Sequence, residues 1–235
     1  MNTRKDIVLK SLKAALPIMA GYVAIGIPCG IMESAVGLTW WMSFLVSVTF
    51  YSGAGQFMIP NLYLAGMPVF SIVASVSFVN SRQILYSTAF SPYFAHVNKV
   101  LSFFFAATVT DESFGVNMER YQTYTSWTPV NALLVNVFSM LSWASANALG
   151  CAVGSMLDLP LAITSFAMTS IFICLMCTQT INRQTLTVMA FAFIGVFVCK
   201  LVGLSGASIL LGAIVGVVAG MLTKPVEGDE TDDNE

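Results

Sequence analysis

Residues that could bind a small polar solute lie in three short stretches of an otherwise apolar chain. Arg82 offers a planar fork of donors that suits a carboxylate, and Asp111 with Glu112 could bind an ammonium group or carry a proton. The full candidate substrate site has seven residues: Gly53, Gly55, Gln56, Asn80, Arg82, Asp111 and Glu112. Acidic groups, a basic group and free backbone amides together suit a zwitterion.

Motifs for other kinds of chemistry are absent from the sequence. There is no G-x-x-x-x-G-K-[ST] phosphate loop, no His, Cys and carboxylate cluster at metal-ligand spacing, and no G-x-S-x-G nucleophile motif. The single histidine, His96, leaves an intramembrane enzyme without a suitable nucleophile and base. Cys174 and Cys177 form a C-x-x-C within an apolar run, and we interpret them as small buried hydrophobes. We therefore expect no metal, no cofactor and no enzymatic activity.

The composition indicates that lipid is the natural solvent of this chain. Of its 235 residues 57% are hydrophobic and only 9% are charged, with a mean hydropathy of +0.80. A soluble domain has about 25% charged residues, so this chain has too little polar surface for a water-exposed globule. Without its acidic tail the chain is mildly basic, and it has no concentrated basic face of the kind that binds nucleic acid.

The candidate residues must be positioned by helices that cross the bilayer, which requires about 20 apolar residues for each crossing. The apolar runs predict about eight such spans: 14–32, 38–59, 67–90, 101–120, 131–149, 161–177, 186–204 and 207–222. We predict an all-α, polytopic transmembrane helical bundle. It comprises an N-terminal segment 1–13, a transmembrane domain 14–224 and a disordered acidic tail 225–235. Four basic residues in segment 1–13 favour a cytoplasmic N-terminus.

Two of the predicted spans carry polar stretches that are open to two interpretations. The run Y-S-G-A-G-Q at 51–56 could unwind a helix within the membrane and expose backbone groups to a substrate, or its small residues could simply allow close helix packing. Arg82 could face the bundle interior or a watery cavity, or it could extend its charged end to an interface.

The fourth span contains the two adjacent carboxylates, which are unusual in so apolar a chain. Its apolar part, residues 101–109, is about half the length that a crossing requires. Either it is a re-entrant half-helix that ends at Asp111 and Glu112, or the span continues to Arg120. Counting basic residues on each side favours a complete crossing, and the alternatives give seven or eight spans. Thr110 and Ser113 could cap a broken helix at this point.

The sequence also suggests an internal repeat, although two alignments disagree in register. In one, residues 29–56 resemble residues 153–179, and in the other Asn80–Gln83 resembles Asn182–Gln184. Repeats of this kind are common in transporters.

Several motifs in this order make the chain similar to the AzlC family of branched-chain amino acid permeases. The motifs are the glycine-rich first span at 21–30, S-G-A-G-Q-F at 52–57, V-N-S-R at 79–82 with L-Y at 85–86, and T-D-E-S-F at 110–114. The resemblance extends over residues 14–222. Ser81 departs from the aliphatic residue expected between Asn80 and Arg82, and the acidic tail has no counterpart in the pattern.

The resemblance implies the large subunit of a two-component exporter in the bacterial inner membrane. It implies branched-chain amino acids (valine, leucine and isoleucine) as substrates, with methionine in some members, and a small AzlD-type membrane subunit as partner. The site residues given above do not come from the resemblance; they are inferred from the chemistry of the side chains.

The combined hypothesis is secondary-active export of a neutral amino acid, coupled to protons. Arg82 or the amides at 53–56 would hold the substrate carboxylate, while Asp111 or Glu112 would hold its ammonium group or carry the proton. In the empty state Arg82 would pair with one of these carboxylates. The alternative is a channel-like pore or a membrane scaffold subunit, whose main working surface would be the glycine face at positions 212, 216 and 220.

Overall fold

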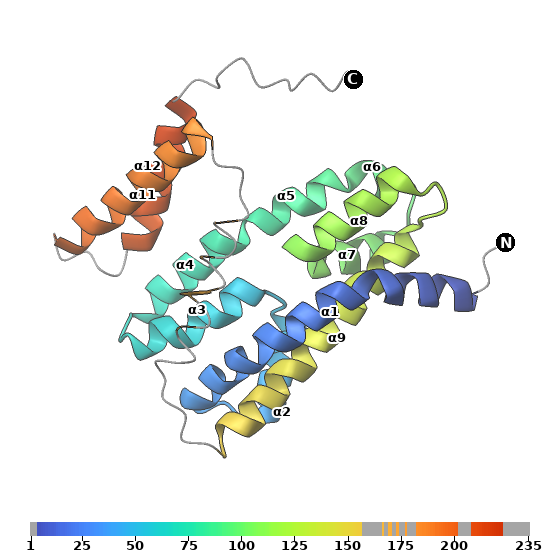
Figure 1. Ribbon diagram of the computed structural model, residues 1–235, viewed down its shortest axis with the longest axis horizontal. Helices are drawn as coiled ribbons and strands as arrows, with labels where there is room; N and C mark the ends of the chain where they lie inside the picture. Colours follow the sequence, from blue (N-terminus) through green and yellow to red (C-terminus); the bar gives the residue numbers. More distant parts are fainter. Residues whose placement is uncertain are drawn as a thin grey trace. The chain divides into compact units, whose positions relative to one another are not determined.

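The computed structural model describes residues 4–156, 166, 169, 170, 173, 177, 182–201 and 208–222, and this part of the chain is helical, without strands (Figure 1). Most of the expected span 161–177, the acidic tail 225–235 and part of the second copy in each repeat alignment lie outside the described residues. The chain forms two compact units, one of Met1–Met67 with Val76–Phe172 and one of Pro68–Ser75 with Ile173–Glu235.

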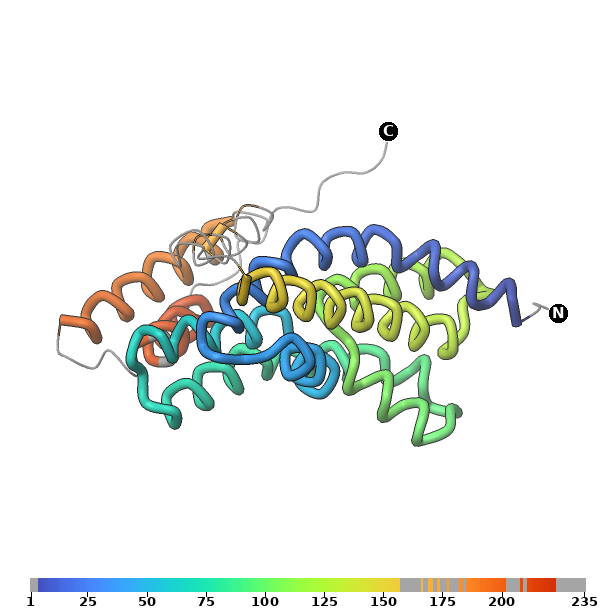
Figure 2. Tube along the Cα trace, turned by 90° about the horizontal axis from the view of Figure 1, so that it is seen from below, coloured from blue at the N-terminus to red at the C-terminus, as the bar shows by residue number. Residues whose placement is uncertain are grey.

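Two long helices form the centre of the first unit. Helix α1 (Arg4–Ala35) has 32 residues and α9 (Pro129–Gly154) has 26, which at ~1.5 Å per residue exceeds the roughly 30 Å of hydrocarbon in a bilayer. Both are apolar enough to cross a membrane. They lie side by side and run in the same direction (Figures 1 and 2), since Asn131 bonds to the Ile7 carbonyl and Ser142 bonds to the Met19 carbonyl.

The contact between α1 and α9 depends on two glycines. A Cβ on Gly30 would lie 1.9 Å from the backbone oxygen of Asn147, and one on Gly150 would lie 2.1 Å from that of Ile27. Real Cβ atoms do not approach backbone oxygens so closely, and neither backbone can move without separating the helices. By contrast, a Cβ on Gly21 of α1 would meet nothing within 4 Å.

We therefore expect Gly30→Ala to lower the melting temperature of the detergent-solubilised protein by roughly 5–10 °C, because overpacking costs about 2–3 kcal/mol. Gly21→Ala is the matched control on the same helix. It should leave the melting temperature unchanged or raise it slightly, since alanine favours helix more than glycine does. Equal melting temperatures for the two variants would contradict this packing.

Helices α2 (Trp40–Thr49) and α3 (Gly53–Leu64) form a hairpin whose tip is at residues 50–52. The two helices contact each other near this tip, where Gln56 on α3 donates to the hydroxyl of Ser47 on α2 at 2.7 Å, while α2 packs mainly against α9. Farther along α3, Asn61 contacts the sulfur of Met32 near the end of α1, so the chain returns to the end from which α2 started. The expected span 38–59 is therefore broken at the Y-S-G-A-G-Q run, and it reverses direction there.

Helices α4 (Val69–Asn80) and α5 (Arg82–Ala89) are interrupted only at Ser81. Ser81 has helical backbone angles (φ −56°, ψ −26°), so the chain continues in nearly the same direction through the break. The one-turn helix α6 (Ser91–Phe94) and a short loop then lead into α7. The expected third span at 67–90 thus corresponds to two helix segments with a break beside Arg82.

Helices α7 (Lys99–Thr108) and α8 (Asp111–Thr123) form a second hairpin with its tip at Val109 and Thr110. Asn136 of α9 bonds to Thr108 at the end of α7 and also to Asn117 in the middle of α8, so both arms flank the same residue. The continuous fourth span that charge counting favoured is therefore not observed. Both residues at the tip have extended backbone angles, and this allows the chain to turn back.

The second unit contains the helix pair α11 (Arg183–Leu201) and α12 (Ser208–Leu222). The glycine face expected on the last span packs within the chain. A Cβ on Gly216 would lie 2.8 Å from the Cβ of Ala192, and one on Gly212 would lie 2.9 Å from the backbone oxygen of Ala192. Close backbone contact through small residues is typical of membrane helices.

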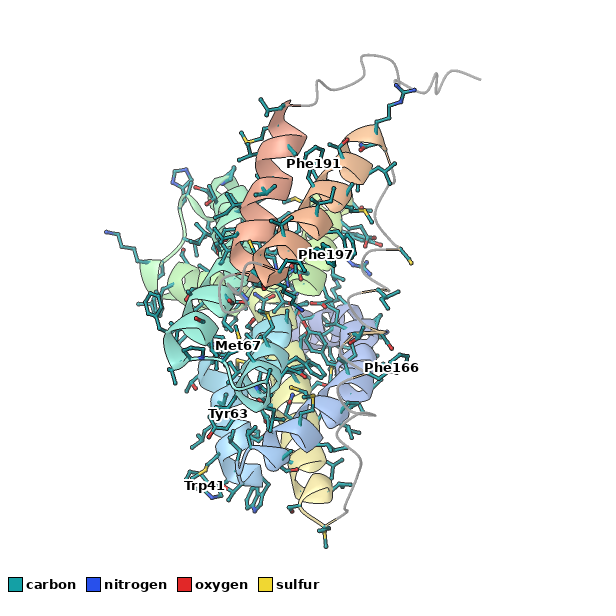
Figure 3. All side chains as sticks on the ribbon, turned by 90° about the vertical axis from the view of Figure 1, so that its left-hand side faces the viewer. Trp41, Tyr63, Met67, Phe166, Phe191 and Phe197 are labelled. Carbon is teal, nitrogen blue, oxygen red and sulfur yellow. The ribbon has the colours of Figure 1, made fainter. Side chains whose placement is uncertain are left out.

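The outer surface carries many large apolar side chains. In Figure 3 Trp41 and Tyr63 on the first unit, and Phe191 and Phe197 on the second, are displayed among such side chains, and their exposed fractions are 47%, 59%, 46% and 56%. Hydrophobic patches of this extent are unusual on soluble monomers. This surface is consistent with a helical membrane protein, while a count of eight spans does not follow from the described residues.

Candidate functional site

Three breaks in helices meet around the side chain of Tyr22, which projects from the middle of α1. The ring of Tyr22 contacts that of Tyr51 at the first break, with ring centroids 6.4 Å apart. Its hydroxyl lies 2.9 Å from the hydroxyl of Thr110 at the third break. The second break, at Ser81, joins the same region through its two neighbours, Asn80 and Arg82.

The first break is fixed by Ser52, the N-cap residue of α3. Its hydroxyl accepts a hydrogen bond from the backbone amide of Gly55 at 3.1 Å and donates one to Oδ1 of Asn80 at 2.6 Å. This junction explains why position 55 is glycine, since a Cβ there would lie 2.8 Å from the Ser52 hydroxyl and 3.1 Å from the Asn80 amide nitrogen. One serine therefore starts α3 and joins the first break to the second.

The third break is fixed by a reciprocal cap at the start of α8. The Thr110 hydroxyl accepts from the amide of Ser113 at 3.4 Å, and the Ser113 hydroxyl accepts from the amide of Thr110 at 2.9 Å. A reciprocal cap of this kind satisfies two backbone donors that a helix leaves unpaired at its start. The expectation that Thr110 and Ser113 cap a broken helix is therefore confirmed.

An ion pair joins the second break to the third. Nη2 of Arg82 lies 2.8 Å from Oδ2 of Asp111, and the two side chains are 38% and 29% exposed. The expected pairing of Arg82 with one of the two neighbouring carboxylates is thus confirmed, with Asp111 as the partner. Glu112 instead accepts a hydrogen bond from the Tyr22 hydroxyl at 2.6 Å. Within the described residues Glu112 has no cationic partner, so it could accept a positive group from a ligand.

Two helix N-termini come together at these breaks, because α3 and α8 begin at Gly53 and Asp111. The first amide groups of a helix have no partner within it, and the helix dipole places partial positive charge there. Such ends attract anions. The site therefore offers a guanidinium and helix amides to a carboxylate, beside a carboxylate that can receive an ammonium group.

The structure divides the predicted site residues between two places. Gly55, Asn80, Arg82, Asp111 and Glu112 lie at the meeting of the three breaks, and Gly53 starts α3 beside them. Gln56 lies one turn farther along α3, and its side chain enters a separate polar cluster. There it donates to Glu33 at 2.6 Å and accepts from the Trp143 indole at 2.8 Å.

Three residues of the site and its surroundings escaped the sequence reasoning: Tyr22, Glu33 and Trp143. A tyrosine and a tryptophan in apolar runs are indistinguishable in sequence from residues of a hydrophobic core. Glu33 did carry a signal, because it is one of very few acidic residues between segment 1–13 and the tail. It directly follows the first apolar run, a position that is equally compatible with the membrane surface and with burial.

Comparison with known proteins identifies the family to which this chain is similar. The family described as AzlC protein matches residues 17–157, which contain all three helix breaks. The branched-chain amino acid transport protein AzlC of Bacillus subtilis is 25% identical over 224 residues, covering 92% of this chain and 85% of that protein. The inner membrane protein YgaZ of Escherichia coli is 24% identical over 225 residues, covering 93% of this chain and 90% of that protein. No solved structure matches the chain.

Proposed function

Because the chain belongs to the AzlC family, we propose that it transports branched-chain amino acids across a membrane by secondary-active export. The name of its Bacillus subtilis relative supports the substrate class. The observation that carries the proposal is the meeting of three broken helices around one ion pair, Arg82 with Asp111. Broken helices that meet within the membrane are the usual substrate sites of secondary transporters.

In this proposal the substrate carboxylate replaces Asp111 as the partner of Arg82. The substrate carboxylate binds Arg82 and the amides that begin α3 and α8, while the substrate ammonium group binds Glu112, where the Tyr22 hydroxyl supports the carboxylate. Asp111 holds Arg82 in the empty state and so lowers the cost of keeping a guanidinium away from water. The side-chain oxygen and amide group of Gln56 already bond to Trp143, Glu33 and Ser47. Gln56 therefore acts by positioning α3.

We place the starting end of α1 in the cytoplasm. Lys10 and Lys13 of α1 line one cavity together with Arg120 near the end of α8. Since α7 and α8 form a hairpin, Lys99 at the start of α7 belongs to this same end of the unit. An excess of Lys and Arg on one side marks the cytoplasmic face. In this arrangement the α7–α8 hairpin enters from the cytoplasm, and the α2–α3 hairpin enters from outside.

The family resemblance also supports a small AzlD-type membrane subunit as partner. The two proteins would together form the exporter in the inner membrane of a bacterium. The chain has no phosphate loop with which to bind ATP, so export would be driven by an ion gradient, and the proposed coupling ion is the proton.

The direct test is amino acid transport by the purified chain in proteoliposomes, with and without a small AzlD-type subunit. We expect saturable leucine transport that a proton gradient drives and a protonophore abolishes, in the absence of ATP. Flux that does not saturate and ignores the proton gradient would favour a pore. Full activity of the chain alone would contradict the two-subunit arrangement while leaving the transport proposal intact.

A further inference from the structure

A carboxylate is buried between the last turn of α1 and the α2–α3 hairpin, away from the three breaks. The side chain belongs to Glu33, which is 2% exposed. One oxygen accepts from the amide of Gln56 at 2.6 Å, and the other accepts from the hydroxyl of Ser43. Both donors are neutral. Within the described residues no Lys, Arg or His contacts Glu33, although a buried charge is normally paired.

This environment suits a proton better than a metal ion. Both carboxylate oxygens receive hydrogen-bond donors, and Gln56 uses its own oxygen to accept from Trp143, so these groups are arranged around an anion. The two donors stabilise the charged carboxylate, while burial without a counter-charge stabilises the neutral acid. A group subject to both effects can gain and lose a proton during a conformational cycle.

Among the residues that the structure describes, the titratable side chains next to Glu33 are thiols. Cys29 on the same helix and Cys151 on α9 interact with it electrostatically, whereas α2 and α3 present Ser43 and Gln56. Because none of these groups carries positive charge, the protonation state of Glu33 itself decides whether the cluster is charged.

A continuous series of contacts connects this cluster to the three breaks. The Trp143 indole donates to Oε1 of Gln56 at 2.8 Å, and the Trp143 ring meets the edge of the Tyr22 ring at a centroid distance of 5.3 Å. Tyr22 in turn donates to Glu112 at 2.6 Å. Gln56 also lies one turn from Ser52, the cap that joins α3 to Asn80. These contacts therefore link Glu33 to the three breaks by two routes, one through Tyr22 and one through Ser52.

We propose that Glu33 carries the proton that drives transport, an inference that rests on the proposed transport function. When the carboxylate binds a proton it becomes a neutral acid, and its hydrogen bond to Gln56 loses the assistance of charge, which roughly halves its strength. The contact between Glu33 and α3 therefore weakens, and Gln56 and Trp143 transmit the change to Tyr22. In the orientation proposed above Glu33 lies toward the outer face, from which protons would enter as the substrate leaves.

The test separates substrate handling from proton coupling in one preparation. The full chain, with the small subunit if it is required, is reconstituted as wild type, Glu33→Gln and Glu119→Gln. Radiolabelled leucine exchange is measured without any gradient, and leucine accumulation is measured with an imposed pH gradient. Glu119 is an exposed acid on α8 and serves as the matched control. Glutamine at 33 can still accept from Gln56 and can donate to the Ser43 hydroxyl, while having no proton to exchange.

We expect Glu33→Gln to keep exchange near the wild-type rate and to lose gradient-driven accumulation by about tenfold or more, while Glu119→Gln keeps both. Wild-type accumulation in Glu33→Gln, or loss of exchange together with accumulation, would overturn the inference. Absence of leucine transport in the wild type would instead refute the proposed function. If Glu33→Gln does not fold, Glu33→Asp should remain coupled with a shifted midpoint in its pH dependence, and an unshifted midpoint would also overturn the inference.

Discussion

Replacing Arg82 with glutamine is expected to reduce leucine transport by about 100-fold or more. Arg82 supplies a guanidinium at the three breaks, where it pairs with Asp111 at 2.8 Å. A hydrogen bond to a charged group contributes about 1.5–3 kcal/mol, and removing one member also leaves the other without a partner. Since 1.4 kcal/mol corresponds to about tenfold in affinity, losing the contact to the substrate carboxylate accounts for an effect of this size.

Two further variants show whether the loss is specific. Arg82→Lys keeps the charge without the planar fork and should retain more transport than Arg82→Gln. Arg120→Gln removes a guanidinium from the other end of the unit, beside Lys10 and Lys13, and should transport leucine at close to the wild-type rate. Initial rates in proteoliposomes, corrected for the amount of folded protein, give the comparison. Equal losses in Arg82→Gln and Arg120→Gln would indicate an effect of net charge.

The second large effect is expected at Glu112. Glu112→Gln should reduce leucine transport by about 30-fold to 100-fold, because the substrate ammonium group loses its charged acceptor. Tyr22→Phe removes only the hydroxyl that supports this carboxylate at 2.6 Å. Its loss should be smaller, about tenfold or less, and should be reduced further when Glu112 is already replaced, because the two side chains act as one unit.

Asp111→Asn distinguishes the two neighbouring carboxylates. Asp111 is paired with Arg82 in the empty protein, so its loss should alter leucine affinity less than Glu112→Gln does. Concentration dependence of leucine exchange measures both variants, with Glu119→Gln as a control for an exposed acid on the same helix. Transport that is unchanged in both Asp111→Asn and Glu112→Gln would remove the carboxylates from the mechanism.

Two of the three helix breaks could be anticipated from sequence because local chemistry marks them, whereas the break at Ser81 was not predicted. Ser52 with Gly53 and Gly55 has the pattern of a cap followed by flexible residues, and Thr110 with Ser113 has that of a reciprocal cap. The ion pair was predictable as well, because two charges of opposite sign are costly in lipid unless they meet.

The direction of the chain after each break could not be predicted in the same way. A serine break that keeps helical angles, as at Ser81, lets the chain continue, whereas the extended residues at Val109 and Thr110 let it reverse. Packing against α9 selects between these outcomes, because Asn136 of α9 hydrogen-bonds to both Thr108 and Asn117. The preference for a crossing fourth span relied on charge counting, which assumed that Lys99 lay outside. The hairpin places Lys99 with the other basic residues.

Burial of Glu33 was equally inaccessible to sequence reasoning. Four helices contribute to its surroundings, and Ser43 and Gln56 reach it only because α2 and α3 form a hairpin beside the end of α1. An acidic residue near the end of an apolar run has the same sequence pattern whether it faces water or a polar cluster. Long-range folding decides between the two.

We propose that the three breaks form one site for a zwitterion, and competition with single-charge analogues tests this most directly. Exchange of radiolabelled leucine by the reconstituted protein is measured in the presence of unlabelled leucine, isoamylamine or 4-methylpentanoate. The last two keep the aliphatic side chain and one charge each. Unlabelled leucine should compete, and each analogue should need a concentration higher by about 100-fold. Competition by either analogue at the concentration effective for leucine would contradict the claim.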